Sequence, residues 1–240
     1  MKNKICLICC RGGSKTIKNK NIKYFAGKPL LSWVIEEAIK SKIFDEIILS
    51  TDSEKIKSIG KKYKILIPGL RPKNLAKSSS DQFETHKYIF NKLGINDKNS
   101  IVCVLNNNPF ITFKLIKKSF KIFKKFKYKR IVADYSKVGG DYIAPKQFFI
   151  KNGVIKFMDR KKFLELKINR QQLKDYYSFI FNIRWGLPSN LSNYKSFKKN
   201  LSNNGHGFEL SKLENFDIDD LEDWKIASII FKSIKNVKRK

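Results

Sequence analysis

A short basic segment near the N-terminus has the composition of a phosphate-binding loop. It directly follows an apolar run typical of a buried strand (5–10) and reads Arg11-Gly12-Gly13-Ser14-Lys15. Its two glycines let the backbone approach a ligand closely and turn successive N–H groups toward an anion, while the arginine, serine and lysine add donors. The segment matches neither the G-x-x-x-x-G-K-[ST] loop nor the G-x-G-x-x-G fingerprint. Taken alone, it fits a triphosphate site and an ordinary strand-to-helix turn equally well.

A pair of carboxylates near the C-terminus has the pattern of a metal site. The segment Phe216-Asp217-Ile218-Asp219 alternates apolar and acidic residues, so on a strand both carboxylates would project from one face. Mg²⁺ binds one or two carboxylates together with waters and substrate phosphates, so such a pair suits it. The alternative is a helix start, in which Asp219 or Asp220 is the N-cap and Glu222 and Asp223 interact favourably with the helix dipole.

The first half of the chain alternates strands and helices, which indicates the elements that position these groups. Apolar patterns predict strands at 5–10, 46–50, 65–67, 100–105 and 130–134, and helices at 29–40, 53–62, 81–93 and 113–126. This alternation predicts an α/β fold with three layers, a mostly parallel sheet covered by helices on both faces. Ligands bind beyond the carboxyl ends of such strands. The basic loop, Asp52, Arg71 and the segment 106–109 all lie at those ends.

The alternation stops after residue 134. A hairpin is expected at 141–157, with Asn152-Gly153 as its turn, followed by a polar segment around Arg170-Gln171-Gln172. Strands at 179–183 and 207–210 return to the sheet. A last helix at 221–234 is expected to bury Leu221, Trp224, Ala227 and Phe231. We interpret residues 1–240 as a single domain in which about 135–178 form an insertion that binds a partner subunit.

Several motifs occur together in a fixed order along the chain. Besides RGGSK, residues 5–63 contain Lys20-Asn21, Ala26-Gly27-Lys28-Pro29-Leu30 and, at 44–52, FDEIILSTD. Further along are Arg71-Pro72, Leu75-Ala76, Arg170-Gln171-Gln172-Leu173 and the 216–219 motif. On these motifs the chain closely resembles the acylneuraminate cytidylyltransferases, which comprise the CMP-N-acetylneuraminic acid synthetases and relatives acting on similar nine-carbon acids.

The resemblance implies a nucleotide-diphospho-sugar transferase (Rossmann-like) fold and a reaction. CTP and a sialic-acid-like 2-keto sugar acid would give a CMP-sugar and pyrophosphate, with Mg²⁺, in a homodimer that serves the synthesis of cell-surface glycans such as lipopolysaccharide or capsule. The implied triphosphate contacts are Arg11, Gly12, Gly13, Ser14 and Lys15. The other implied roles are Lys20 beside the α-phosphate, Asn21 and Arg71 on the nucleotide, Arg170 and Gln171 near the acid sugar, and Asp217 and Asp219 on the metal. Lys20, Arg11 and Lys15 would be catalytic.

Three segments depart from the family pattern. Lys18 stands where the family usually has a proline, and 181–185 replaces a strand that contains Asn-Gly. Asn106-Asn107-Asn108-Pro109 replaces a Gln-Pro-Thr-Ser-Pro run whose glutamine contacts the base. Asn107 fits two interpretations, a hydrogen bond to the base edge and a polar turn before a helix.

The formal net charge of +30 invites a nucleic-acid or membrane interpretation. Lysine is spread over nearly every segment, however, and the densest stretch, 114–130, has apolar residues at helical spacing. We therefore interpret these lysines as a solvated face that attracts acidic small substrates, and expect neither nucleic-acid binding nor membrane insertion.

Cysteine usage and the N-terminus indicate a reducing compartment. Cys6 and Cys9 have C-x-x-C spacing, but residues three apart on a strand face opposite sides, so we expect free buried thiols. The N-terminal residues do not resemble a signal peptide, and we expect a cytoplasmic protein. Two rival functions stay open: a nucleotidyltransferase acting on another sugar acid or a sugar phosphate, and a non-catalytic descendant that binds through its basic surface.

Overall fold

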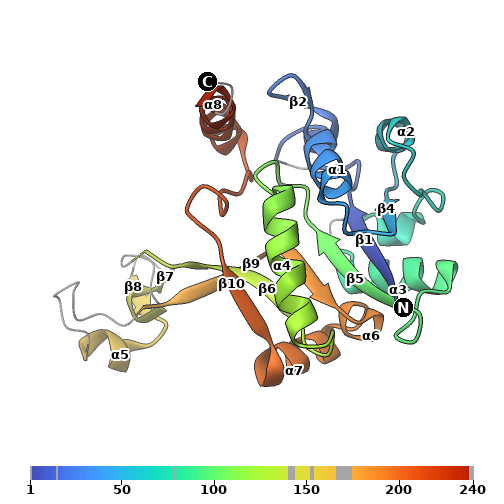
Figure 1. Cartoon of the computed structure of the whole chain (residues 1–240). Coiled ribbons are helices and arrows are strands. Elements are labelled where there is room, and N and C mark those ends of the chain that lie inside the picture. The colour runs from blue at the N-terminus through green and yellow to red at the C-terminus, as the bar shows by residue number, and fades with distance from the viewer. Residues whose placement is uncertain are drawn as a thin grey trace.

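The core of the molecule is a six-stranded, mostly parallel sheet (Figure 1). The computed structural model describes residues 2–14, 16–77, 79–139, 144–151, 154–165 and 175–237. In spatial order the strands are β10 (His206–Glu209), β6 (Val132–Lys137), β9 (Tyr177–Gly186), β5 (Ser100–Leu105), β1 (Asn3–Cys9) and β4 (Glu46–Ser50). Only β9 runs antiparallel to its neighbours within this sheet. The predicted α/β architecture is confirmed.

Helices cover both faces of the sheet, because side chains alternate along each strand. Cys6 and Ile8 of β1 pack with α1 (Leu30–Ser41), α2 (Glu54–Lys62) and α4 (Phe113–Lys125). Ile5 and Leu7 face the other way, and their cluster includes side chains of α3 (Gln82–Leu93), α6 (Pro188–Leu191) and α7 (Tyr194–Asn204). Cys6 and Cys9 therefore lie on opposite faces, as expected, and all four cysteines are free thiols.

Most predicted elements of the first half lie within two residues of their expected bounds. Strands 46–50 and 100–105 are exact, and Asp81 and Thr112 cap α3 and α4 by accepting hydrogen bonds from Phe83 N and Leu115 N. The strand expected at 65–67 is reduced to an isolated bridge between Ile48 and Leu66. The remaining short elements are η1 (Lys20–Ile22), β2 (Tyr24–Phe25), β3 (Lys28–Pro29), η2 (Lys73–Leu75) and η3 (Ala144–Lys146).

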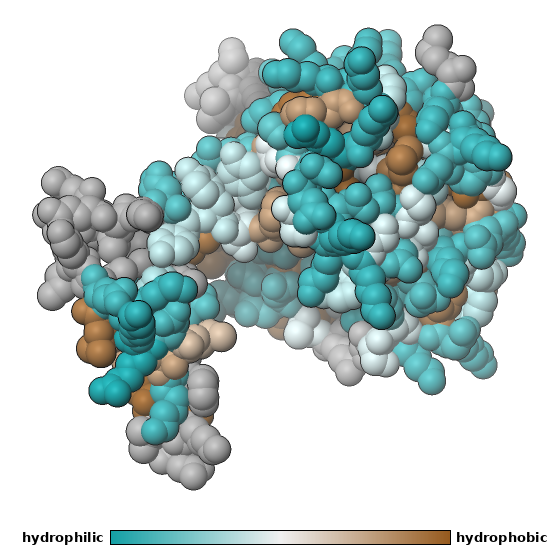
Figure 2. Space-filling model, turned by 90° about the horizontal axis from the view of Figure 1, so that it is seen from below, coloured by the Kyte–Doolittle hydropathy of each residue, from teal (hydrophilic) through white to brown (hydrophobic). Residues whose placement is uncertain are grey.

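The insertion projects from the body as an arm (Figure 1). It contains the expected hairpin, β7 (Phe148–Lys151) paired antiparallel with β8 (Val154–Phe157), and α5 (Arg160–Leu164). The turn Asn152-Gly153 lies outside the described residues. Most of the surface seen in Figure 2 is hydrophilic, but hydrophobic side chains are also exposed on this arm. Those more than half exposed are Ile150, Ile155, Met158 and Leu164.

The C-terminal helix α8 (Leu221–Val237) packs on a third, smaller core. Trp224, Ala227 and Phe231 are buried there as expected, with the Phe25 ring edge-on to Trp224 at 5.3 Å. The expected burial of Leu221 is wrong: its side chain is 53% exposed, because it occupies the first position of the helix, beyond the third core. Within the described parts of the chain, no helix has the length and apolar character to span a membrane.

Candidate active site

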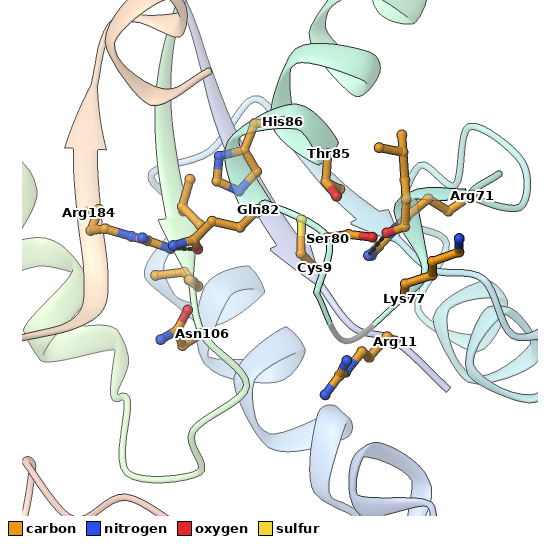
Figure 3. Close-up of a pocket in the computed structure, with 13 residues that line it drawn as sticks. Cys9, Arg11, Arg71, Lys77, Ser80, Gln82, Thr85, His86, Asn106 and Arg184 are labelled. Atoms are coloured by element: carbon orange, nitrogen blue, oxygen red, sulfur yellow. Dashed lines mark hydrogen bonds between the residues drawn. The ribbon is translucent and has the colours of Figure 1, made fainter. Parts of the chain in front are cut away.

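A cationic pocket of about 250 Å³ lies at the carboxyl ends of β1 and β5 (Figure 3). Its walls come from the end of β1, the loop after it, the 71–82 segment, α3, the end of β5 and β9. The cations that line it are Arg11, Arg71, Lys77 and Arg184, and no carboxylate is among the described lining residues. The position agrees with the expected ligand site of a parallel α/β sheet, and the charge suits an anionic substrate.

The basic loop after β1 is held open by its neighbours. The Gly12 N–H donates to Asp52 Oδ1 at 2.8 Å, and Asn21 Nδ2 donates to the Arg11 carbonyl at 2.8 Å. Asp52 does not cap α2, because Ser53 occupies the N-cap position, without a side-chain cap bond; Asp52 instead supports the loop. A Cβ at Gly13 would meet nothing within 4 Å, so this face of the loop is open.

Asn21 connects the loop after β1 with the loop after β5. Asn107 Nδ2 donates to Asn21 Oδ1 at 2.7 Å, so two residues expected at the nucleotide lie against each other. Asn106, and not Asn107, lines the pocket. The buried Asn107 Oδ1 has no hydrogen-bond partner among the described residues.

Arg71 lies across the end of β4 and is fixed by the backbone around it. Its Nη2 donates to the Ser50 carbonyl at 2.9 Å and its own N–H to the Thr51 carbonyl at 2.7 Å. The guanidinium is thereby held on the pocket wall before any ligand binds, which lowers the entropic cost of a contact with a nucleotide.

Ser14 follows Gly13 in the loop, whereas Lys15, Arg170 and Gln171 lie outside the described residues.

The 216–219 segment forms no strand among the described residues, so the strand on which the two carboxylates would share one face is not seen. Its carbonyls are held by two side chains: Asn108 Nδ2 donates to Phe216 O at 2.9 Å, and Lys20 Nζ donates to Ile218 O. The burial of residues 217–219 nevertheless alternates. Ile218 is buried, whereas Asp217 and Asp219 are exposed.

The helix-capping interpretation applies to the next carboxylates. Asp220 Oδ1 accepts from the N–H groups of Glu222 and Asp223 at 2.8 Å, and Asp223 Oδ2 accepts from those of Asp219 and Asp220. This reciprocal arrangement is a capping box. The capping role expected for Asp220 and Asp223 is confirmed, and it leaves the side chains of Asp217 and Asp219 outside the cap.

The donor set at Asp217 and Asp219 fits Mg²⁺ and excludes a closed structural metal site. No group of three or more His, Cys, Asp or Glu side chains converges within the described ranges. Two exposed carboxylates leave most of a coordination shell to waters and substrate phosphates, which is how Mg²⁺ is usually bound.

Three buried polar residues of the pocket region were not predicted from the sequence. His86, Asp134 and Arg184 are at most 3% exposed. Burial raises the pKa of Asp134, whose carboxylate accepts from Asn182 N at 3.0 Å and Ile183 N at 2.7 Å, where the β6–β9 register shifts. Burial lowers the pKa of Arg184 and, with Arg184 nearby, lowers the pKa of His86 to about 3. Arg184 could have been recognised in the sequence, because it is a charged residue inside the otherwise mostly apolar run 179–185.

Comparisons with known proteins agree with this geometry. The family model described as cytidylyltransferase matches residues 5–203. The chain is 30% identical over 239 residues to the pseudaminic acid cytidylyltransferase of Campylobacter jejuni subsp. jejuni serotype O:2, with 97% of both covered. It is 29% identical over 231 residues to the N-acylneuraminate cytidylyltransferase of Escherichia coli O18:K1:H7, covering 94% of this chain and 51% of that protein.

The fold is shared with a solved nucleotide-bound enzyme. The structure of CMP:2-keto-3-deoxy-manno-octonic acid synthetase complexed with CTP matches with a TM-score of 0.71 at 13% identity, covering 97% of this chain and 99% of that one. The resemblance inferred from the motifs is confirmed by the family model and the relatives. The chain therefore belongs to the acylneuraminate-type cytidylyltransferases, a family of nucleotidyltransferases.

Proposed function

We propose that the protein transfers a cytidylyl group from CTP to a sialic-acid-like nine-carbon 2-keto sugar acid, with Mg²⁺, and releases pyrophosphate. One contact carries this proposal: Lys20 Nζ donates to the carbonyl of Ile218, 198 residues away. It holds Lys20, five residues beyond the basic loop, against the backbone between Asp217 and Asp219, which supports a single site for the phosphates and the metal. The relatives named for pseudaminic acid and N-acylneuraminate support the class of acceptor.

In the reaction, the anomeric hydroxyl of the sugar acid attacks the α-phosphorus of CTP and the bond to pyrophosphate breaks. Arg11, Ser14 and Lys15 hold the triphosphate, and Lys20 lies beside the α-phosphate, where negative charge grows. Asp217 and Asp219 would hold Mg²⁺, which would supply further charge neutralisation. Arg170 and Gln171 contact the acid sugar. Positioning and electrostatics provide most of the rate enhancement, as in other phosphoryl-type transfers.

We further propose that the active form is a homodimer joined through the arm. The arm exposes Ile150, Ile155, Met158 and Leu164, and at its base Tyr177 and Phe179 are 51% and 44% exposed. Apolar side chains grouped on a projection are typical of a protein–protein interface.

The nucleotide is tested by thermal unfolding of the full chain with CTP, UTP, ATP or GTP in the presence of Mg²⁺. A ligand that binds only the folded protein raises the melting temperature, and at one hundred times its Kd the stabilisation is about 2.7 kcal/mol. We expect CTP to give the largest shift and removal of Mg²⁺ to reduce it. Equal shifts with all four nucleotides would contradict the proposed donor. A shift that disappears steeply with added salt and shows no base preference would favour the polyelectrolyte-binding alternative.

A further inference from the structure

Two unpaired polar atoms lie at one side of the cationic pocket. The side chains of His86 on α3 and Arg184 on β9 both line it and are 1% and 3% exposed. Within the described part of the chain, His86 Nε2 and Arg184 Nε have no hydrogen-bond partner. Unpaired buried polar groups destabilise a folded protein and are rare in native structures, so a pair of them beside a pocket points to a ligand.

The unpaired histidine nitrogen is an acceptor. His86 Nδ1 lies 2.6 Å from the carbonyl oxygen of Leu191, which can only accept, so Nδ1 carries the proton. Burial and the positive charge of Arg184 lower the pKa of His86 to about 3. At neutral pH the ring is therefore uncharged, with a bare lone pair on Nε2.

The unpaired arginine nitrogen is a donor. Arg184 Nη2 donates to Gln82 Oε1 at 3.0 Å, and Gln82 itself is exposed on the first turn of α3. Figure 3 shows the ends of these two side chains pointing toward each other beside His86. The amide carbonyl of Gln82 thus occupies a position that a carbonyl oxygen of a ligand can take. The charge of the nearby Asp134 carboxylate partly offsets that of the guanidinium.

We propose that His86 and Arg184 read the Watson–Crick edge of cytosine, an inference that rests on the proposed use of CTP. The 4-amino group of cytosine is a donor for His86 Nε2, and its N3 and O2 are acceptors for the guanidinium. The pocket volume of about 250 Å³ is below the roughly 300–1,000 Å³ of sites that enclose whole ligands. It suits one base, with the ribose and phosphates extending toward Arg11 and the open loop.

The same pair of atoms disfavours other occupants. Uracil presents a carbonyl oxygen in place of the 4-amino group, so its lone pairs would face the lone pair of His86 Nε2. A carboxylate of the acid sugar would pair with Arg184 but has no proton to donate to His86. Leaving a buried polar atom unpaired is what makes a hydrogen-bonding site reject a near-isosteric ligand.

The test is calorimetric binding to the full chain with Mg²⁺ and without acceptor sugar. The ligands are CTP, UTP and the triphosphate of the 2-pyrimidinone nucleoside, which keeps N3 and O2 but lacks the 4-amino group. For the wild type we expect CTP to bind at least tenfold more tightly than either of the others. In His86→Phe, CTP and the pyrimidinone triphosphate should bind alike. Arg184→Met should bind all three triphosphates at least about tenfold more weakly than the wild type does. The matched control is Ile89→Val, a core substitution on the same helix, which should keep the wild-type ratios.

The outcomes distinguish failure of this inference from failure of the proposed function. If the wild type bound the pyrimidinone triphosphate as tightly as CTP, the inference would be overturned. This comparison needs no variant, so it tests the inference even if a variant does not fold. A CTP preference that survives in both variants would also overturn it, while leaving the proposed cytidylyl transfer intact. A wild type that binds no CTP would contradict the proposed function itself.

Discussion

Asp217→Asn is expected to lower kcat by about a thousandfold while leaving the fold intact. Neutralising one carboxylate would weaken the proposed Mg²⁺ site. A bound metal ion typically stabilises transition-state charge by several kcal/mol, and about 1.4 kcal/mol corresponds to a tenfold change in rate. Asp217 is exposed, and its side chain accepts a hydrogen bond from the neighbouring Ile218 N–H at 2.8 Å. The measurement is pyrophosphate release at saturating CTP over a range of Mg²⁺ concentrations, together with a thermal melt. Asp219→Asn should behave in the same way.

The matched control is Asp220→Ala, three residues from Asp217. Asp220 caps α8, so this substitution should lower the free energy of unfolding by about 1 kcal/mol and leave kcat close to the wild-type value. The two substitutions thus have opposite signatures. If Asp220→Ala abolished turnover and Asp217→Asn did not, the assignment of the metal carboxylates would be wrong.

Lys20→Met should have the second largest effect, a decrease in kcat of about 10²–10³-fold. The substitution removes a cation from the position proposed for the α-phosphate, where a single oriented donor is worth this much. It also removes the contact with the Ile218 carbonyl that holds the carboxylate segment. The measurement is steady-state turnover with CTP and the best acceptor of a sugar-acid panel.

Lys18→Met is the control for charge alone. Lys18 is exposed and lies two residues before Lys20. Its substitution by methionine removes the same formal charge as Lys20→Met. We expect nearly unchanged turnover for Lys18→Met and partial activity for Lys20→Arg, which keeps a cation in a different shape. Equal losses in Lys18→Met and Lys20→Met would show that the general positive field, and not a positioned amine, supports the reaction.

Local patterns predicted the parallel half of the fold well. Strand and helix periodicity is a property of short segments, so the strands at 46–50 and 100–105 are exact and the helix expected at 81–93 begins one residue later. The α6–α7 region, 188–204, was missed. Its sequence is rich in Asn, Ser and Lys, and Phe197 is the one fully buried residue of α7, so the apolar stripe that signals a helix is nearly absent.

The site could be predicted only in its local parts. The basic loop, Lys20-Asn21 and Asp217/Asp219 could be proposed from the sequence because each is a short motif. In the structure, Lys20 contacts the backbone of Ile218 and Asn21 that of Arg11. Asn108 and His86 have no local signal: their roles depend on contacts with residues 108 and 105 positions away in sequence. Such pairings arise from the tertiary arrangement of loops around the sheet, which a single sequence does not display.

The central claim, cytidylyl transfer to a sialic-acid-like acceptor, is tested most directly by incubating the purified full chain with CTP, Mg²⁺ and a panel of nine-carbon 2-keto sugar acids. We expect pyrophosphate and the CMP-sugar in equal amounts with at least one acid, loss of both products when Mg²⁺ is chelated, and little product with UTP. Absence of pyrophosphate with every acid of the panel, from protein that is folded and binds CTP, would contradict it.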